Sequence, residues 1–218
     1  MAAKSSNAST IEKILSIEWD MFTCVNEGKS RAACQDDPVT FMGMRRAQFE
    51  AWPSDIAESY LSDLHQALLC GRNLAQEKYI HMMDLTDPVK SFALLATIDI
   101  PSSGAYTLSR EITSILLEQM SKLYEAHPHL QGTGRPLYSV SDFDGFGAQT
   151  SLETYQLGEL LTYSMNTLTA LNKYLLTEEG RTFSERILKN TVKFYGYNSL
   201  DEADKAAERM AQKYDRIL

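Results

Sequence analysis

The stretch that decides the fold is residues 106–126, YTLSREITSILLEQMSKLYEA. Its apolar side chains recur at steps of three and four residues, at Ile112, Ile115, Leu116, Met120 and Leu123. This period places them on one side of a helix and leaves polar side chains on the other. The stretch therefore predicts a long amphipathic helix that packs one face against other helices.

The segments on both sides of that helix have the same character. Helical spacing of apolar residues, with capping residues or Pro at several starts, predicts helices over 9–26, 38–52, 54–70, 73–85, 88–98, 151–177, 181–195 and 199–218. Strand-like alternation is weak throughout, which disfavours a βαβ fold. The irregular segment from His127 to Thr150 is long, and such segments are usually functional or mobile. We expect an all-α, single compact multi-helix domain over 1–218, with one long glycine-containing loop and residues 1–8 flexible.

Composition narrows the possible functions. The 218 residues are 44% hydrophobic and 23% charged, which is ordinary for a globular domain. No apolar run approaches the ~18 residues that a membrane span needs, and the N-terminus lacks the features of a signal peptide. We therefore expect a cytoplasmic protein with no membrane partner. The net charge of −8 argues against DNA as a partner, but it permits a cationic ligand, or RNA held by a local basic patch.

Motifs for metals and cofactors are missing from the sequence. The three cysteines, Cys24, Cys34 and Cys70, show no CxxC spacing, which disfavours a disulfide framework or a zinc site. No HExxH or Glu-x-x-His pattern occurs, and the glycine-containing segment 131–136 lacks the Lys-Ser/Thr of a P-loop. We expect neither a metal nor a cofactor.

Glu18 interrupts an apolar stripe. The stripe consists of Ile11, Ile14, Leu15, Phe22 and Val25. An ionised carboxylate on a buried helix face is costly unless it is paired. Glu18 is therefore either an edge residue that reaches a salt bridge or solvent, or a pocket carboxylate that holds a cation or a proton.

A second acidic group precedes the helix that begins at Pro38. Gln35, Asp36 and Asp37 stand together there, and Asp is a favoured helix cap. One Asp satisfies a cap and leaves the other surplus, and adjacent carboxylates raise each other's pKa unless a cation neutralises them. The group is either a capping cluster or part of a ligand site.

Two helix faces carry polar residues of unusual kinds. Arg45, Gln48 and Trp52 fall at i, i+3 and i+7, so one face presents a guanidinium, an amide and an indole, although Trp52 also suits plain packing. The second face, beside a leucine stripe, carries Gln156, Glu159, Tyr163 and Asn166. Gly158 next to Glu159 lets another backbone or a substrate come close. A solvated face usually carries Lys and Glu, so the second face indicates a pocket wall.

A basic stripe runs against the acidic average. Arg186, Lys189 and Lys193 stand at i, i+3 and i+7, which suits either phosphate contacts or an ordinary solvated face. Arg135, in the loop, fits either a phosphate contact or a turn.

The chain resembles a bacterial and fungal family long catalogued as a domain of unknown function. The segments that carry the resemblance are Ile17-Glu18-Trp19-Asp20-Met21-Phe22, Arg31-Ala-Ala-Cys34-Gln35-Asp36-Asp37, Phe41-Met-Gly-Met-Arg45-Arg-Ala-Gln48-Phe49, Gly134-Arg135-Pro136, Leu152-Glu153-Thr154-Tyr155, Gly158-Glu159-Leu160 and Tyr195-Gly196-Tyr197. They span nearly the whole chain, and Cys-Gln-Asp-Asp is the most specific. The family's fungal members include the arginine-containing cyclodipeptide synthases, which use aminoacyl-tRNAs to make cyclo-arginine-Xaa dipeptides.

The resemblance implies a transferase of specialised metabolism that uses arginyl-tRNA and a second aminoacyl-tRNA. Because an aminoacyl ester is already activated, peptide-bond formation needs positioning, a base and oxyanion donors. The expected catalytic residues are Glu159, Tyr163, Tyr155 and Arg45. The expected substrate-binding residues are Glu18, Asp36, Asp37, Gln35, Gln48, Trp52 and Glu153. The expected tRNA contacts are Arg135, Arg186, Lys189 and Lys193.

Two other classes of function remain open. One is a different enzyme, or a binder, that uses the same acidic pocket for a free cationic amine. The other is a helical interaction protein without catalysis.

Overall fold

The computed structural model describes residues 2–25, 32–139 and 150–215. These residues form eleven α-helices and two short 3-10 helices, and no β-strand occurs among them. The predicted all-α fold is therefore confirmed. No helix within the described ranges combines the length and the apolar character that crossing a membrane requires.

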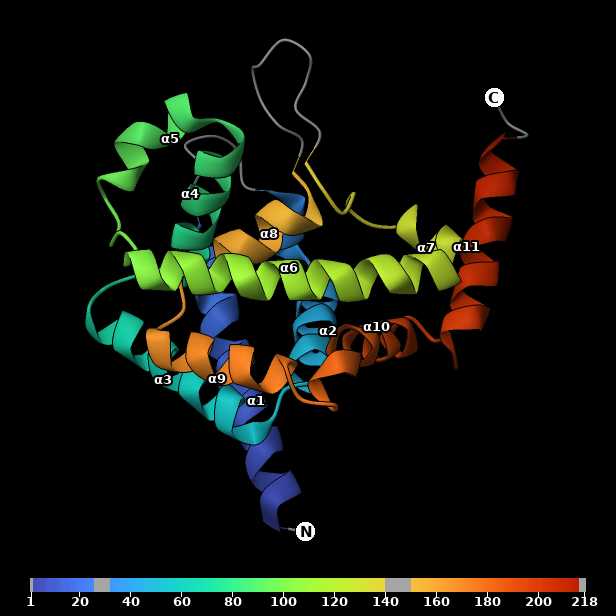
Figure 1. The fold of residues 1–218 in the computed structure, drawn as a ribbon, viewed down its shortest axis with the longest axis horizontal. Helices are drawn as coiled ribbons and strands as arrows, with labels where there is room; N and C mark the ends of the chain where they lie inside the picture. The colour runs from blue at the N-terminus through green and yellow to red at the C-terminus, as the bar shows by residue number, and fades with distance from the viewer. Residues whose placement is uncertain (1, 26–31, 140–149, 216–218) are drawn as a thin grey trace.

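The predicted amphipathic helix is α6 (Ser103–Ala126), which lies across the middle of the molecule (Figure 1). Its buried residues include Ile112, Leu116 and Met120, as the apolar stripe predicts. The helices that α6 contacts include α8 (Leu152–Leu160), α9 (Met165–Leu175) and α10 (Phe183–Phe194).

The N-terminal helices form the other half of the core. These are α1 (Ala2–Thr23), α2 (Pro38–Phe49), α3 (Ser54–Leu69) and α4 (Leu74–Thr86). Helix α1 contacts the other three. It begins at Ala2, earlier than the start at residue 9 that the sequence predicted. Alanine has the highest helix propensity, and Ala2, Ala3 and Ala8 support the earlier start.

The predicted helix over 151–177 is two helices. Helix α8 ends at Leu160, and α9 starts at Met165 after the cap residue Ser164. The Ser164 hydroxyl accepts a hydrogen bond from the backbone N–H of Thr167, which starts a new helix. The Ser164 N–H donates to Asp63, at 3.0 Å, and this contact fixes the break against α3.

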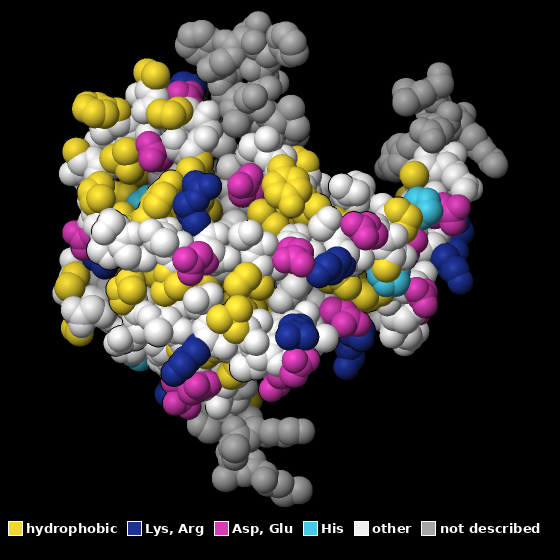
Figure 2. Space-filling view, in the orientation of Figure 1, with side chains coloured by type: hydrophobic (Ala, Val, Ile, Leu, Met, Phe, Trp, Pro, Cys, Tyr) yellow, Lys and Arg dark blue, Asp and Glu magenta, His cyan; other side chains and the backbone are white. Residues whose placement is uncertain are grey.

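The remaining elements are short or lie at the edge. They are η1 (Ala33–Asp36), α5 (Pro88–Leu95), α7 (Pro128–Gln131), η2 (Gly180–Thr182) and α11 (Leu200–Asp215). Helix α7 lies inside the segment predicted as a long loop. Residues 140–149 of that segment are outside the described residues. Figure 2 shows basic side chains lying beside acidic ones on one face of the molecule.

Candidate functional site

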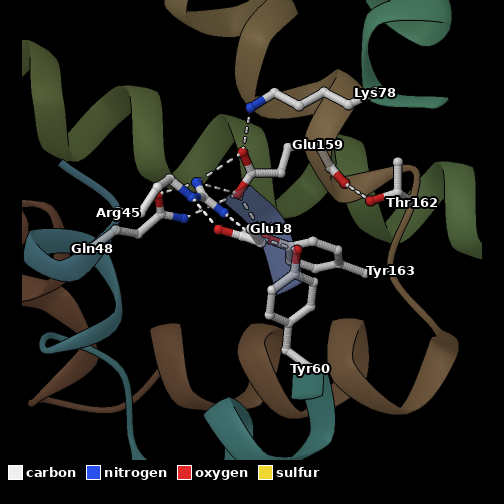
Figure 3. A network of polar contacts seen from close by, with 8 residues as sticks. All are labelled: Glu18, Arg45, Gln48, Tyr60, Lys78, Glu159, Thr162 and Tyr163. Carbon is white, nitrogen blue, oxygen red and sulfur yellow. Dashed lines mark hydrogen bonds and ion pairs between the residues drawn. The ribbon is translucent and has the colours of Figure 1, made fainter. Parts of the chain in front are cut away.

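Arg45 of α2 lies at the centre of a buried polar network (Figure 3). Its Nε donates to Glu18 of α1 at 2.7 Å, and its Nη2 donates to the other oxygen of the same carboxylate. Its Nη1 donates to Glu159 of α8 at 3.0 Å and to the amide oxygen of Gln48 at 2.7 Å. One guanidinium thus joins α1, α2 and α8, and α8 is more than 100 residues from the other two.

Glu159 receives donors from several directions (Figure 3). Lys78 of α4 donates to Oε2 at 2.6 Å, and the Tyr163 hydroxyl donates to Oε1 at 2.8 Å. The Gln48 amide donates to Oε1 at 3.1 Å. With Arg45, these bonds fill the roughly four acceptor positions of a carboxylate.

Gly158 explains how Lys78 reaches Glu159. A Cβ at Gly158 would stand 2.6 Å from Met82 Cγ and 3.0 Å from the Lys78 carbonyl oxygen, so only glycine fits this crossing. Helices α8 and α4 therefore meet backbone to backbone, and Lys78 lies beside the residue that follows Gly158. The predicted close approach at Gly158 is confirmed, and the approaching partner is another helix.

Two tyrosines complete the network. The hydroxyl of Tyr60 of α3 donates to Glu18 at 2.7 Å, as Tyr163 does to Glu159. Burial, assisted by the adjacent carboxylates, raises the pKa of both phenols well above the ordinary value. Both tyrosines therefore remain protonated donors at neutral pH.

The charges of the network balance. Glu18, Arg45, Lys78 and Glu159 each expose no more than 9% of their surface, and two positive charges match two negative ones. Burial alone would raise the pKa of Glu159, but Arg45 and Lys78 outweigh burial and hold that pKa far below the usual range. Burial alone would lower the pKa of Arg45, and Glu159 with Glu18 raises it instead. Glu159 is therefore a stable carboxylate and a weak base.

A cavity of about 290 Å³ opens onto one side of this network. Arg45, Gln48, Glu159 and Tyr163 form its polar end. Helices α6, α8 and α10 supply most of the remaining wall with apolar side chains, among them Leu116, Met120, Leu160 and Leu188.

The cavity wall also includes the predicted residues Trp52 and Tyr155. Trp52 packs in the core with its ring 5.2 Å from that of Phe49, and its indole N–H has no hydrogen-bond partner among the described residues. The Tyr155 ring carries two cations, Lys78 with Nζ 3.4 Å from the ring centroid and Arg135 with Cζ 4.9 Å from it. Arg135 itself is exposed. Its contact with the Tyr155 ring places it next to the cavity wall.

The structure does not bring Asp36 and Asp37 to the network. Both are exposed, and Asp37 caps α2 by accepting a hydrogen bond from the Thr40 backbone N–H at 3.0 Å. That hydrogen bond lowers the pKa of Asp37. Asp36 ends a short 3-10 helix on the surface and Asp37 follows it, so neither joins the network of Glu18 and Glu159.

Gln35 is buried, but its side chain is used by the fold. Its amide donates to the carbonyl oxygens of Phe22 and Val25, at 2.8 and 2.9 Å. Its own oxygen accepts from the Ala32 N–H. These bonds fasten the segment before α2 to the end of α1, so Gln35 acts as a structural residue here.

Glu153 and Asn166 lie away from the cavity. Glu153 lines a separate hollow with Arg110 of α6, because it lies on a different face of α8 from Glu159. Asn166 is exposed on α9, beyond the break at Ser164 that the sequence analysis did not predict. The predicted polar stripe therefore extends through Tyr163 only.

The basic stripe is on α10, but it is not an open row of charges. The Arg186 guanidinium donates to the carbonyl oxygens of Glu179 and Ala51 and to the Tyr174 hydroxyl, which ties it to the fold. Lys189 pairs with Glu185 at 2.7 Å. Lys193 is exposed and lines a groove between α2 and α10.

Lys78 and Tyr60 belong to the network but were not predicted from the sequence. Tyr60 stands on the apolar stripe of α3, with Ile56 and Leu64 four residues away on either side. Lys78 stands between Leu74 and Met82 on the buried side of α4 in the same way. A basic or phenolic side chain at the centre of an apolar stripe is the same signal that singled out Glu18.

No cluster of three or more His, Cys, Asp or Glu side chains that could hold a metal ion occurs among the residues that the structure describes. The network instead consists of ion pairs and neutral donors.

Together, the fold and the site define an all-α protein in which a buried, charge-balanced network closes one end of a cavity. The chain belongs to the DUF4125 family, described as a protein of unknown function, and the match covers residues 8–205. The predicted membership of a family of unknown function is confirmed. The comparisons found no matching curated protein and no matching solved structure.

Proposed function

We propose that this protein forms a cyclic dipeptide from two aminoacyl-tRNAs, with arginine as one of the two amino acids. The choice of arginine and of tRNA comes from the resemblance of the sequence segments to arginine-containing cyclodipeptide synthases. The observation that supports a reaction at this site is that residues from separate segments of the resemblance lie close together in the fold. Glu18, Arg45, Gln48 and Glu159 come from three separate segments of that resemblance. Arg45, Gln48 and Glu159 meet at the polar end of one cavity, and Glu18 accepts hydrogen bonds from Arg45.

The proposed chemistry needs no group beyond the substrates. The α-amine of one aminoacyl ester attacks the carbonyl carbon of the other, and the ester C–O bond breaks. The departing ribose oxygen of the tRNA takes the proton that the amine loses and becomes the free hydroxyl. A second attack of the same kind closes the ring and releases the second tRNA.

The network suits the demands of these steps. An α-amine has a pKa of about 7.7–8.0, so a useful fraction is already neutral at pH 7 without a strong base. Glu159, as a weak base, therefore serves to position Arg45 and Tyr163 in this scheme. Arginine has five N–H donors, and bonds to Glu18, Gln48 and Glu159 use four of them among the described residues. The fifth is a candidate donor to the oxyanion.

Transfer RNA would meet an acidic protein, so we assign its contacts to local cations. Arg135 is the best placed, because it is exposed and lies over the Tyr155 ring at the cavity wall. Lys193 is exposed on α10. The predicted contact Arg186 is left out of this proposal, because its guanidinium donates to the carbonyl oxygens of Glu179 and Ala51.

Expression in a bacterial host, with mass spectrometry of the extracts for cyclic dipeptides, tests the proposal. We expect an arginine-containing cyclic dipeptide, and we expect RNase to abolish its formation in the lysate. Product that survives RNase and depends on free amino acids would indicate an enzyme acting on free amines. No product from charged tRNA pools would favour an interaction protein.

A further inference from the structure

We infer that the cavity beside the network holds the second amino acid, as an uncharged and largely apolar side chain, and does not hold arginine. This assignment rests on the proposed function, because it places one of the two amino acids of the product in the cavity and arginine outside it. The observations that support it are the volume of the cavity, its apolar wall and the balanced charge at its polar end.

The size of the cavity fits one amino-acid side chain. Its volume of about 290 Å³ is just below the ~300–1,000 Å³ that ligand pockets usually span. A whole dipeptide joined to two tRNA ends would exceed it.

The wall favours an apolar occupant. Leu116 and Met120 of α6, Leu160 of α8, and Phe183, Ile187 and Leu188 of α10 face the same space. Burying an aliphatic or aromatic side chain among them changes the binding constant by about 10- to 100-fold.

The polar end does not offer a counter-charge to a guanidinium. Glu159 is the one carboxylate among the described residues that line the cavity, and Arg45, Lys78, Gln48 and Tyr163 already occupy its oxygens. A third cation would enter a site whose charges are already balanced, and it would lose its hydration without a new partner. The same balance favours the neutral form of an incoming α-amine, which is the form that attacks an ester.

Amino-acid amides provide a direct test, because they share one head group and differ only in the side chain. L-phenylalaninamide and L-argininamide would be titrated into the purified protein by calorimetry. The variant Leu188→Trp fills the cavity from α10, and Leu69→Trp makes the same change at a position that is 83% exposed at the end of α3. Thr191→Phe, at a half-buried position of the wall, fills the cavity a second way if Leu188→Trp does not fold.

We expect filling the cavity to weaken L-phenylalaninamide binding at least about tenfold and to change L-argininamide binding by less than about twofold. Leu69→Trp should change neither. The inference is overturned if L-argininamide loses as much affinity as L-phenylalaninamide, if filling has no effect on either, or if L-phenylalaninamide does not bind. If the protein forms the cyclic dipeptide but the two amides do not respond to filling as expected, the cavity assignment is wrong and the proposed function stands. If the amides respond as expected but charged tRNA gives no cyclic dipeptide, the proposed function is wrong and the preference of the cavity for an apolar side chain stands.

Discussion

Two acidic regions of this protein look alike in the sequence and differ completely in the structure. Glu18 and Glu159 are buried and bonded to Arg45, whereas Asp36 and Asp37 are exposed at the start of α2. Glu18 interrupts an apolar stripe, and Glu159 stands on a polar face beside a leucine stripe. The two aspartates stand together before a proline. A single carboxylate on or beside an apolar stripe therefore marked an interior site, and a cluster of charges before a helix marked a cap.

The largest expected effect concerns the central guanidinium. Arg45→Met leaves the buried Glu18 and Glu159 without their shared partner, so the free energy of unfolding should fall by about 3–5 kcal/mol. The adjacent Arg46 is the matched control, because it pairs with the exposed Glu12 at 2.6 Å. Arg46→Met should cost no more than about 1 kcal/mol. Urea unfolding of both variants measures the difference, and equal losses would mean that the interior network does not stabilise the fold.

The second effect depends on pH. Because the folded pKa of Glu159 is lowered, its ionisation stabilises the fold above its unfolded pKa of ~4.3, and this contribution is lost as the pH falls toward the folded pKa. Glu159→Gln should cost roughly 3 kcal/mol at pH 7, and the gap from wild type should shrink between about pH 5 and pH 3. Chemical unfolding across this range checks the sign. A gap that stays constant with pH would contradict the assignment.

The third effect concerns the helix crossing that brings Lys78 to Glu159. Gly158→Ala forces a Cβ against Met82 and the Lys78 carbonyl, and it should destabilise the protein by about 1–3 kcal/mol. Gly104 is also in a helix, but the nearest heavy atom to its Cβ position is 3.9 Å away. Gly104→Ala should stabilise by about 0.5–1 kcal/mol. Thermal unfolding of Gly158→Ala and Gly104→Ala measures the difference, and equal effects of the two changes would mean that α4 and α8 are not in close contact at Gly158.

The smallest effect belongs to the surface region. Asp37→Ala removes a helix cap and should lower the free energy of unfolding by about 1 kcal/mol. It should leave product formation unchanged, because Asp37 is outside the cavity. If a folded Asp37→Ala variant lost product formation, Asp37 would belong to the functional site after all.

The sequence predicted the helical class, most helix positions and every residue of the network except Tyr60 and Lys78. Glu18, Arg45, Gln48 and Glu159 were found because each is the wrong kind of residue for its helix face. Their mutual contacts were not predicted, since Arg45 and Glu159 are 114 positions apart and helical periodicity is local. The break before α9 was missed because the leucine spacing continues through it, and the hydrogen bonds of Ser164 to Thr167 and Asp63 mark the break.

The misplaced residues have physical explanations too. Asp37 was predicted as a ligand because capping and cation binding use the same side chain, and the sequence does not separate the two. Arg186 was predicted as a phosphate contact from its position alone. Its hydrogen bonds to Ala51 and Glu179 depend on how α10 packs, which spacing does not show.

The central claim is that the interior network, and not the surface aspartates, is where aminoacyl-tRNAs react. The most direct measurement is the rate of cyclic dipeptide formation by purified protein from arginyl-tRNA and a second aminoacyl-tRNA, for the wild type, Glu159→Gln and Asp37→Asn. We predict product with the wild type and Asp37→Asn at similar rates, and a loss of about 100-fold or more with folded Glu159→Gln. Loss of product in Asp37→Asn with retention in Glu159→Gln, or no product from any of the three, would contradict the account.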